Sequence, residues 1–553
     1  MPAWTAASAA IMIEILRVLA EGTATSPRRL AVAPLAKSRR YQLTSNSALS
    51  LSSLRRFTRS RIGGLLSSGS HHTTTLGLTV ARAHGRVRGM APIQLIHDAT
   101  IVTADDAGSI LYDAAIAVSD GRITALGPTS ELLARYPDAE RVYGRGRAVF
   151  PGFANTHTHL SRVLARGIYE DLSPPHAPPF TGGLAPLPLP ALTADEERAM
   201  ALLGALEAIR SGTTLVLEES AGLDGYAGAL VDTGLRLVLC ERAWDRANAS
   251  IGQPGPFQVD PALADIGLTR IAEFHSRWEG KGDGRVRAGL AAWAPDMCSP
   301  GLLSRLRKLQ SELDAIATVH LNQIWGEVAA VKEQRGVLPT EYLAQAGLLS
   351  KRLVAAHCRC MTDEEERILG ASGAAVAVNP AIAARRGLAA RIDELERAGC
   401  LVTLGTDNMA EDMVEVVRTA LFMERVRRQD GRRPTPEEAL VWATRNGYRA
   451  LGVPDGGWLA PGNRADLILV DLRKPHLTPA LRVVSCFVHQ GMASDVEAVM
   501  VDGRWIMRDG RVLTMDETAI VADADRIARA AWRKLFERRP ELARPPGLDI
   551  GTR

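Results

Sequence analysis

The chain of 553 residues is long enough for several domains, and its 46% apolar and 23% charged residues are typical of a globular protein. This composition excludes a wholly disordered chain, a collagen-like fibre and a disulfide scaffold. No uninterrupted apolar run reaches the roughly 18 residues of a membrane span, so no membrane association is expected. Six cysteines without paired spacing favour a reducing, cytoplasmic location.

The formal net charge of +4 is unevenly distributed. Residues 1–89 hold thirteen Lys or Arg and two acids, Glu14 and Glu21, so they carry +11 and the rest of the chain carries −7. This Ser- and Arg-rich segment is expected to be a disordered leader, or to result from a translation start assigned ahead of Met90. The alternative is a targeting or interaction segment, and a nucleic-acid role for this segment stays open. Because the body is acidic, no nucleic-acid partner is expected.

Short β-type runs lie near both ends of the remaining chain. They cover residues 93–96, 100–103, 115–118 and 123–126 and, later, 465–470, 496–501 and 505–507. Turn signals such as Asp120-Gly121 and Asp502-Gly503 separate them. We expect residues 90–148 and 453–517 to form one small antiparallel domain, a β-sandwich built from both chain ends.

The middle of the chain, residues 149–452, alternates between strand-like and helix-like segments. Strands are predicted at 148–154, 213–218, 235–240, 286–292, 316–320, 353–357, 374–379 and 401–406, and helices at 194–211, 301–313, 326–334, 363–372 and 413–428. Eight such strands predict the α/β class and a (β/α)8 barrel. The Pro-rich residues 174–190 are expected to form a long loop and possible substrate lid, and 518–553 a helix outside the barrel with a tail.

The strongest local signal is PGFANTHTH at residues 151–159. His157 and His159 stand at i and i+2 of a predicted strand, so both point to one face and can bind one metal ion. A hydrogen-bonded structural pair is the alternative. The motif ends the first predicted barrel strand, where active sites of this architecture lie.

Three further polar residues end later strands. His320 and His357 close the fifth and sixth predicted strands, and Asp407 follows the eighth. Each alone fits a structural histidine or a helix cap. Together they place two imidazoles and a carboxylate at the same barrel face as the histidine pair, which predicts a metal site.

These motifs resemble the amidohydrolase superfamily, in the branch of cytosine deaminase, S-adenosylhomocysteine deaminase and the s-triazine hydrolases. The resemblance covers roughly residues 93–517 and rests on PGFANTHTH, LARG (164–167), RSGTT (210–214), VHLNQ (319–323), AAHC (355–358), GTDN (405–408) and LAPGNRADLILVD (459–471), in family order. It implies a metal-dependent hydrolase in which a metal-activated hydroxide attacks a planar N-heterocyclic or amidine-like carbon. Ammonia, an amine or a better leaving group such as halide would depart.

The resemblance also implies roles for individual residues. His157, His159, His320 and Asp407 would hold one divalent metal, with zinc expected and iron possible. Asp407 would also accept the proton of the attacking water, and His357 would lie beside the substrate. The predicted fourth strand, 286–292, contains no lysine, which disfavours the carbamylated-lysine, two-metal variant. Homo-oligomers are common among such enzymes, so a homo-oligomer is expected.

Gln323 departs from the deaminase pattern, which has a glutamate three residues after the third histidine. An amide cannot shuttle protons, and general acid–base catalysis is typically worth about 10²–10⁴-fold. Three interpretations stay open: a substrate whose leaving group needs less help, a proton shuttle by Glu327 or by a water that Gln323 holds, or binding of a different substrate face by Gln323. An ordinary helix-surface acid is the favoured interpretation of Glu327.

Other residues near strand ends are weaker candidates. Trp293 and Trp325 would line the mouth and stack on a flat ring, or only pack there. The acids Glu218, Glu219, Asp296, Glu411 and Asp412 suit N–H-rich or cationic groups, but helix capping accounts for most of them. Cys358 and Cys360 are disfavoured as a soft metal site. Rival functions are hydrolysis of an amide, carbamate or urea C–N bond, and an inactive binding or assembly protein.

Overall fold

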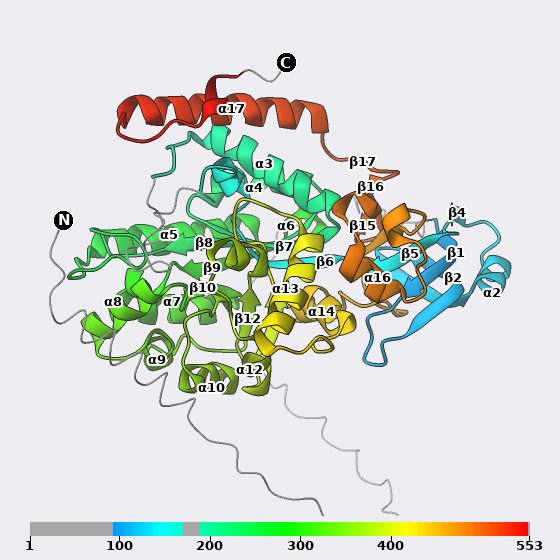
Figure 1. Cartoon of the computed structure of the whole chain (residues 1–553), viewed down its shortest axis with the longest axis horizontal. Helices are drawn as coiled ribbons and strands as arrows, with labels where there is room; N and C mark the ends of the chain where they lie inside the picture. The colour runs from blue at the N-terminus through cyan, green and yellow to red at the C-terminus, as the bar shows by residue number, and fades with distance from the viewer. Residues whose placement is uncertain (1–91, 170–187, 551–553) are drawn as a thin grey trace, which may run out of the picture. The chain divides into compact units, whose positions relative to one another are not determined.

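The computed structural model describes residues 92–169 and 188–550. The chain divides into two units, Met1–His84 and Gly85–Arg553, and the first lies outside the described residues. The expected leader and residues 174–187 of the expected Pro-rich loop therefore also lie outside them. The fold below is that of the second unit (Figure 1).

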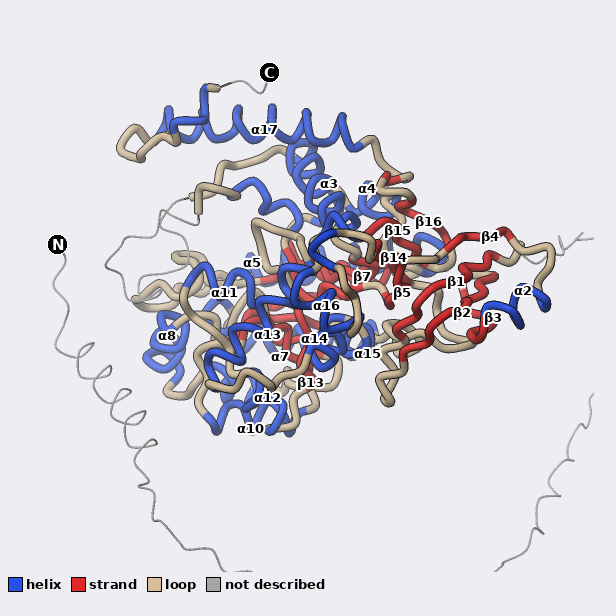
Figure 2. The backbone as a smooth tube through the Cα atoms, turned by 45° about the vertical axis from the view of Figure 1, so that its right-hand side comes forward, coloured by secondary structure: helices blue, strands red, loops and turns tan. Residues whose placement is uncertain are grey.

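Eight parallel strands form the predicted barrel. Their order in the sheet is their order in the chain, and Figure 2 shows them enclosed by helices. They are β6 (Phe153–Thr158), β7 (Thr213–Ser220), β8 (Arg236–Ala243), β9 (Val286–Ala292), β10 (Ala317–Leu321), β11 (Leu353–His357), β12 (Ala375–Val378) and β13 (Leu401–Leu404). A parallel bridge between Thr158 and Asp407 joins the last strand to the first. The predicted (β/α)8 fold is thereby confirmed.

Helices alternate with these strands, and all five helices predicted between strands are present. Their starts follow capping rules: Thr193, Thr362 and Thr435 each form a capping box with a glutamate three residues later. The helices are α2 (Thr129–Arg135), α3 (Ala194–Arg210), α4 (Ala227–Asp232), α5 (Pro261–Trp278), α6 (Lys281–Gly284), α7 (Pro300–Leu313), α8 (Trp325–Arg335), α9 (Pro339–Gln345), α10 (Asp363–Ser372), α11 (Pro380–Arg386), α12 (Ile392–Arg397), α13 (Met413–Arg428), α14 (Pro436–Ala443), α15 (Arg445–Ala450), α16 (Val483–Gln490) and α17 (Glu517–Arg538).

Strands from both chain ends form a second sheet, as predicted. It is mixed, because β1 pairs in parallel with β4 and β5, whereas the sequence pattern indicated antiparallel pairs only. The strands are β1 (Gln94–Val102), β2 (Ile110–Ser119), β3 (Arg122–Pro128), β4 (Glu140–Tyr143), β5 (Arg147–Pro151), β14 (Leu467–Asp471), β15 (Val496–Val501), β16 (Arg504–Arg508) and β17 (Arg511–Val512). Ile116, Val149, Leu467 and Met500 from both halves share one apolar core.

The predicted strand 148–154 is divided between the two sheets. β5 pairs with β14, and β6 pairs with β7, so the chain crosses from the small domain to the barrel at Gly152. A Cβ atom at Gly152 would lie 2.1 Å from Oγ1 of Thr214, which leaves no room for any other residue. The crossing is not visible in the sequence, because buried residues of β5 and β6 form one continuous, mostly apolar run.

A buried ion pair joins the small domain to the barrel. Arg236 of β8 donates to Asp466 in the terminal ADL motif, with Nε 2.8 Å from Oδ2. The hydroxyl of Tyr448 donates to the same carboxylate at 2.9 Å. Charges that are paired and hydrogen-bonded in this way are stable in an apolar interior. The aspartate of the ADL motif (residues 465–467) therefore has a structural role, which is to join the small domain to the barrel.

The terminal helix α17 packs against α3, outside the barrel, as predicted (Figure 1). Its buried side, including Ile527, Trp532 and Phe536, covers Val163 and Leu164. The indole of Trp532 donates to the carbonyl of Leu164 at 2.8 Å. The helix thus supports the short helical turn that follows His159. None of the helices in residues 92–169 and 188–550 combines the length and the hydropathy of a transmembrane segment.

Close approach of β6 to the turn after β13 requires glycine at position 405. A Cβ atom there would lie 2.7 Å from the carbonyl oxygen of His157 and 2.9 Å from its amide nitrogen. We expect Gly405→Ala to force this turn away from β6 and to lower stability by about 1–3 kcal/mol. Thermal unfolding measures this. Gly431→Ala is the control, since a Cβ atom there meets nothing within 4 Å; equal midpoints for both variants would contradict the steric argument.

Candidate metal centre

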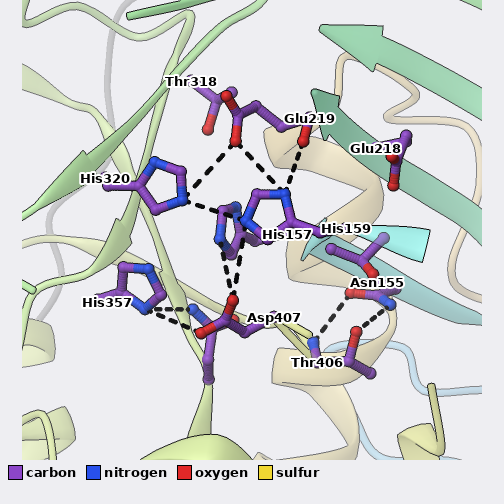
Figure 3. A network of polar contacts seen from close by, with 12 residues as sticks. Asn155, His157, His159, Glu218, Glu219, Thr318, His320, His357, Thr406 and Asp407 are labelled. Atoms are coloured by element: carbon purple, nitrogen blue, oxygen red, sulfur yellow. Dashed lines mark hydrogen bonds and ion pairs between the residues drawn. The ribbon is translucent and has the colours of Figure 1, made fainter. Parts of the chain in front are cut away.

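Five side chains meet at the carboxyl ends of four barrel strands (Figure 3). His157 lies on β6 and His159 directly follows it; His320 lies on β10, and His357 ends β11. Asp407 follows β13 and reaches β6 through two backbone hydrogen bonds, Asp407 N–H to the His157 carbonyl at 3.0 Å and His159 N–H to the Asp407 carbonyl at 2.9 Å. Barrel closure therefore brings together residues separated by 250 positions of sequence.

Two overlapping groups among the described residues have the geometry to hold a metal ion. His157, His159 and His320 form one, and His157, His357 and Asp407 form the other; within each, the ligand atoms lie within 4.8 Å of one another. Asp407 Oδ1 lies 4.0 Å from His157 Nε2 and 3.8 Å from His159 Nε2. All the sequence-derived ligand candidates thus lie in one cluster.

The hydrogen bonds of His159 and His320 determine which ring nitrogens carry protons. Nδ1 of His159 lies 2.6 Å from the carbonyl of Glu219, and Nδ1 of His320 lies 2.7 Å from the carbonyl of Trp293. A carbonyl only accepts, so both Nδ1 atoms donate and, in neutral rings, both Nε2 atoms are bare lone pairs. Burial lowers the pKa of both histidines, which keeps them neutral.

The two bare Nε2 atoms face each other at 3.2 Å. Two lone pairs cannot form a hydrogen bond and repel each other, so a cation bound by both nitrogens would stabilise this arrangement. His157 adds to the argument: it is fully buried, and neither ring nitrogen has a hydrogen-bond partner within the described part of the chain. Imidazoles held by Nδ1–H···O=C bonds are typical metal ligands. The donor set therefore fits a divalent metal.

Two residues of the cluster have strained backbones. His357 has φ of 77° and Asp407 has φ of 70°, in the left-handed region that residues other than glycine seldom adopt. Such conformations cost about 1–3 kcal/mol each and are concentrated at functional sites. Burial raises the pKa of Asp407, while Arg386 and Arg359 oppose this by stabilising the carboxylate.

Glu219 approaches the histidines more closely than its expected capping role requires. Its Oε2 lies 3.6 Å from His159 Nδ1 and 3.7 Å from His320 Nε2 (Figure 3). Arg242 Nη2 donates to the same oxygen at 2.8 Å. Burial raises the pKa of Glu219, but Arg242 outweighs it and the pKa is lowered overall. The sequence feature that indicated Glu219 as a candidate was its place in the adjacent acids Glu218 and Glu219 at the end of a buried strand.

The other candidate acids are structural. Glu218 accepts from Leu160 N–H and Tyr226 O–H, both at 2.8 Å. Glu411 accepts from Thr158 and Thr406, Asp412 caps α13, and Asp296 accepts from the backbone of Gly252. Of these four, Asp412 is the residue that caps an α-helix; the other three accept from hydroxyls or from backbone amides outside α-helices, so capping does not account for most of the group as expected.

The environment of Glu218 predicts a dependence of stability on pH. Burial raises its pKa from 4.5 to about 8. Between these values the folded state binds one more proton than the unfolded chain, so this carboxyl lowers stability as the pH rises from 4.5 towards 8. We expect Glu218→Gln to lose less stability over this interval than the wild type, measured by urea unfolding of metal-free protein. The exposed Glu312→Gln is the control, and parallel curves for all three proteins would contradict the pKa assignment.

Gln323 is buried at the end of β10, and its Oε1 has no hydrogen-bond partner among the residues described. Glu327 is also fully buried, so the expectation of a helix-surface acid is wrong. Its two carboxylate oxygens accept from the amides of Asn322 and Gln323 at 2.9 and 2.7 Å. Glu327 thus clamps the backbone that carries Gln323, a role that its helical position did not indicate.

The two tryptophans differ in their relation to the cluster. Trp293 is partly buried, its carbonyl accepts from His320, and Arg242 lies 5.2 Å from its ring centroid. Trp325 is partly buried at the start of α8, and nothing among the described residues connects its ring to the histidines. Cys358 and Cys360 are buried and free, and neither belongs to a metal-capable group in the described chain.

The sequence analysis missed two residues that contact His357. Arg359 Nη2 lies 3.0 Å and Asn379 Nδ2 lies 2.9 Å from His357 Nδ1. Arg359 also lies 3.7 Å from Asp407 Oδ2. Arg359 follows His357 by two residues and Asn379 directly follows β12, so their place just beyond strand ends was the available signal.

Curated proteins of known activity are similar in sequence to this chain. The 5-methylthioadenosine/S-adenosylhomocysteine deaminase of Desulforudis audaxviator is 34% identical over 425 residues, covering 75% of this chain and 94% of that protein. The 5'-deoxyadenosine deaminase of Methanothermobacter thermautotrophicus is 33% identical over 436 residues, covering 76% and 96%.

Solved structures share the fold. An adenosine deaminase from Xanthomonas campestris with bound zinc has a TM-score of 0.71 at 26% identity and covers 82% of this chain and 100% of that one. The atrazine chlorohydrolase of Arthrobacter aurescens, complexed with zinc, has a TM-score of 0.68 at 22% identity, covering 78% and 99%; this likeness concerns the fold alone.

Two family profiles match the sequence. A short match over residues 114–139 is to an imidazolonepropionase-like composite domain of bacteria and falls on β2, β3 and α2. The longer match covers residues 148–506, which includes the barrel, the cluster of histidines and the ADL motif. The chain therefore belongs to the amidohydrolase family.

Proposed function

We propose that this protein is a mononuclear metal-dependent hydrolase that replaces a leaving group on a planar N-heterocyclic or amidine-like carbon with oxygen from water. The observation that carries this proposal is the convergence of His157, His159, His320 and Asp407, with two bare Nε2 atoms 3.2 Å apart. The deaminase relatives and the absence of lysine on β9 support one metal ion at this site. Stacking on Trp293 or Trp325 would hold the ring.

The three histidines and Asp407 would hold the ion, and zinc suits imidazole and carboxylate ligands. When bound, a metal of this kind lowers the pKa of a water ligand from 15.7 to about 7. The zinc in the Xanthomonas campestris adenosine deaminase structure supports this choice of metal.

The protein's own groups would handle protons and charge. Asp407, whose Oδ2 lies 3.7 Å from Arg359 Nη2, would accept the proton released as water attacks the carbon. The bond from that carbon to the leaving group then breaks, and the leaving group takes the bonding electron pair. His357, whose buried Nε2 has no hydrogen-bond partner among the described residues, would hydrogen-bond to the reacting groups. Gln323 holds the substrate or a water but transfers no proton.

Gln323 favours leaving groups that depart without a proton donor. The named activities of the relatives are deaminations of adenosine-type nucleosides. Ammonia needs protonation to depart, whereas halide and thiolate do not. Displacement of halide or thiolate from the same kind of ring is therefore the second candidate function. Assembly as a homo-oligomer and a cytoplasmic location stay predictions.

A substrate panel on metal-quantified protein tests the proposal. It would contain adenine nucleosides, chloro- and thio-substituted heterocycles, aryl amides and ureas, with products identified by mass. We expect an oxo-substituted ring as product and loss of turnover after chelation, restored by zinc. Cleavage confined to amides or ureas would favour C–N bond hydrolysis of that type, and a stable metal-free protein without turnover would favour a binding role.

A further inference from the structure

Arg359 is a buried cation in contact with the candidate site. Its side chain is 1% exposed, and Nη2 lies 3.0 Å from His357 Nδ1. The guanidinium is charged at neutral pH, because arginine is not deprotonated in proteins. Nε and Nη1 have no hydrogen-bond partner among the described residues, so the contact with His357 is its main polar interaction there besides the ion pair with Asp407.

A guanidinium has N–H donors only and no acceptor. Nδ1 of His357 therefore presents its lone pair to Arg359. Oδ2 of Asp407 lies 3.9 Å from the same nitrogen, which is too long for a hydrogen bond from Nδ1. The amide of Asn379 lies 2.9 Å from the same nitrogen, and with Nδ2 facing the ring it donates as well. A flipped amide would set Oδ1 against the lone pair, so the contact with Arg359 also decides the orientation of Asn379.

The proton of the neutral His357 ring consequently lies on Nε2. This tautomer is the opposite of that in His159 and His320, whose Nδ1 atoms donate to carbonyls. The cluster thus contains two rings with bare Nε2 atoms and one ring with an Nε2–H. The His357 ring centroid lies 5.0 Å from that of His157 and 5.3 Å from that of His320, so the ring adjoins two of the candidate ligands.

We propose that Arg359 is a positioning residue that, together with Asn379, holds His357 in the Nε2–H tautomer, so that His357 is a hydrogen-bond donor at the reacting centre and not a proton acceptor. This inference deepens the proposed hydrolase function and rests on it for its catalytic meaning. It implies a substrate with a hydrogen-bond acceptor beside the attacked carbon, such as an unprotonated ring nitrogen, on which negative charge develops.

Nitrogen NMR of the histidine rings tests the tautomer without turnover. Zinc-loaded protein labelled with ¹⁵N-histidine would be compared with His357→Gln, which identifies the His357 signals. We expect the Nε2–H pattern in the wild type and in Arg359→Lys, which keeps a donor without an acceptor. Arg359→Met is expected to show a mixture of tautomers. A wild-type spectrum with the proton on Nδ1 would overturn the proposal whether or not any variant folds.

Kinetics on an accepted substrate provides the second readout. We expect Arg359→Met to lower kcat by about 10²-fold with little change in KM, as for loss of one donor to a developing charge, and Arg359→Lys to recover part of it. Arg385→Met is the control, because this exposed arginine of α11 pairs with Glu415 at 3.0 Å. An unchanged kcat in Arg359→Met would overturn the positioning role. If His357 has the Nε2–H tautomer but the protein has no hydrolase activity, the proposed function is wrong and the tautomer assignment stands.

Discussion

Asp407→Ala is expected to lower kcat by about 10⁴-fold, at the upper end for loss of a general base, because the same carboxylate is a candidate metal ligand. Its Oδ1 lies within 4.0 Å of both His157 and His159. The fold is expected to persist, since the backbone of Asp407, and not its side chain, makes the hydrogen bonds that close the barrel. Turnover, zinc content and circular dichroism of the same preparation measure these effects.

The left-handed backbone of Asp407 calls for two controls. Alanine at φ of 70° is strained by about 1–2 kcal/mol, whereas asparagine tolerates this region. Asp407→Asn should therefore lose turnover to a similar degree while keeping wild-type stability. Asp314→Ala replaces another left-handed aspartate, 77% exposed and remote from the cluster, and should leave turnover unchanged. Wild-type kinetics in both Asp407 variants would remove this residue from the mechanism.

Gln323→Glu is expected to raise deamination by about 10²-fold relative to displacement of halide or thiolate, because a carboxyl group restores general acid–base catalysis for a poor leaving group. The side chain is buried, and its Oε1 has no partner among the described residues, so a carboxyl would fit with little steric change. Glu327 holds the backbone amide of Gln323 and so keeps the position of the new side chain. The ratio of kcat/KM values for amino- and chloro-substituted rings measures the effect.

The matched control for this change is Gln345→Glu, an exposed glutamine at the end of α9. It makes the same chemical substitution away from the cluster and should leave the ratio unchanged. An unchanged or lower ratio in Gln323→Glu would show that another group supplies protons, or that Gln323 binds a substrate face remote from the leaving group.

Periodicity in the sequence was sufficient to predict the barrel. Each strand is a short apolar run followed by a helix, so the eight strands and their order could be read locally. The cluster followed from the same rule, because carboxyl ends of parallel strands meet at one face of a barrel. His157, His159, His320, His357 and Asp407 were found in this way, each at or just beyond a strand end.

Local sequence patterns did not predict the structure where contacts with other, buried segments of the chain determine it. The crossing at Gly152 is not visible in the run 148–154, because both β5 and β6 are buried and only strand pairing distinguishes them. Glu327 has the position of an exposed helical acid, yet the loop before α8 folds its amides onto the carboxylate. Parallel pairing of β1 with β4 and β5 likewise depends on contacts between distant segments.

The sequence by itself thus determined the barrel, the face that carries the chemistry and the set of ligand candidates, because these follow from strand order and residue type. Only the tertiary structure decided how each side chain is protonated and paired. The carbonyls of Glu219 and Trp293 place the protons of His159 and His320 on Nδ1, whereas the guanidinium of Arg359 places the proton of His357 on Nε2. Such hydrogen bonds depend on distances of about 3 Å between strands, which residue spacing along one chain does not specify.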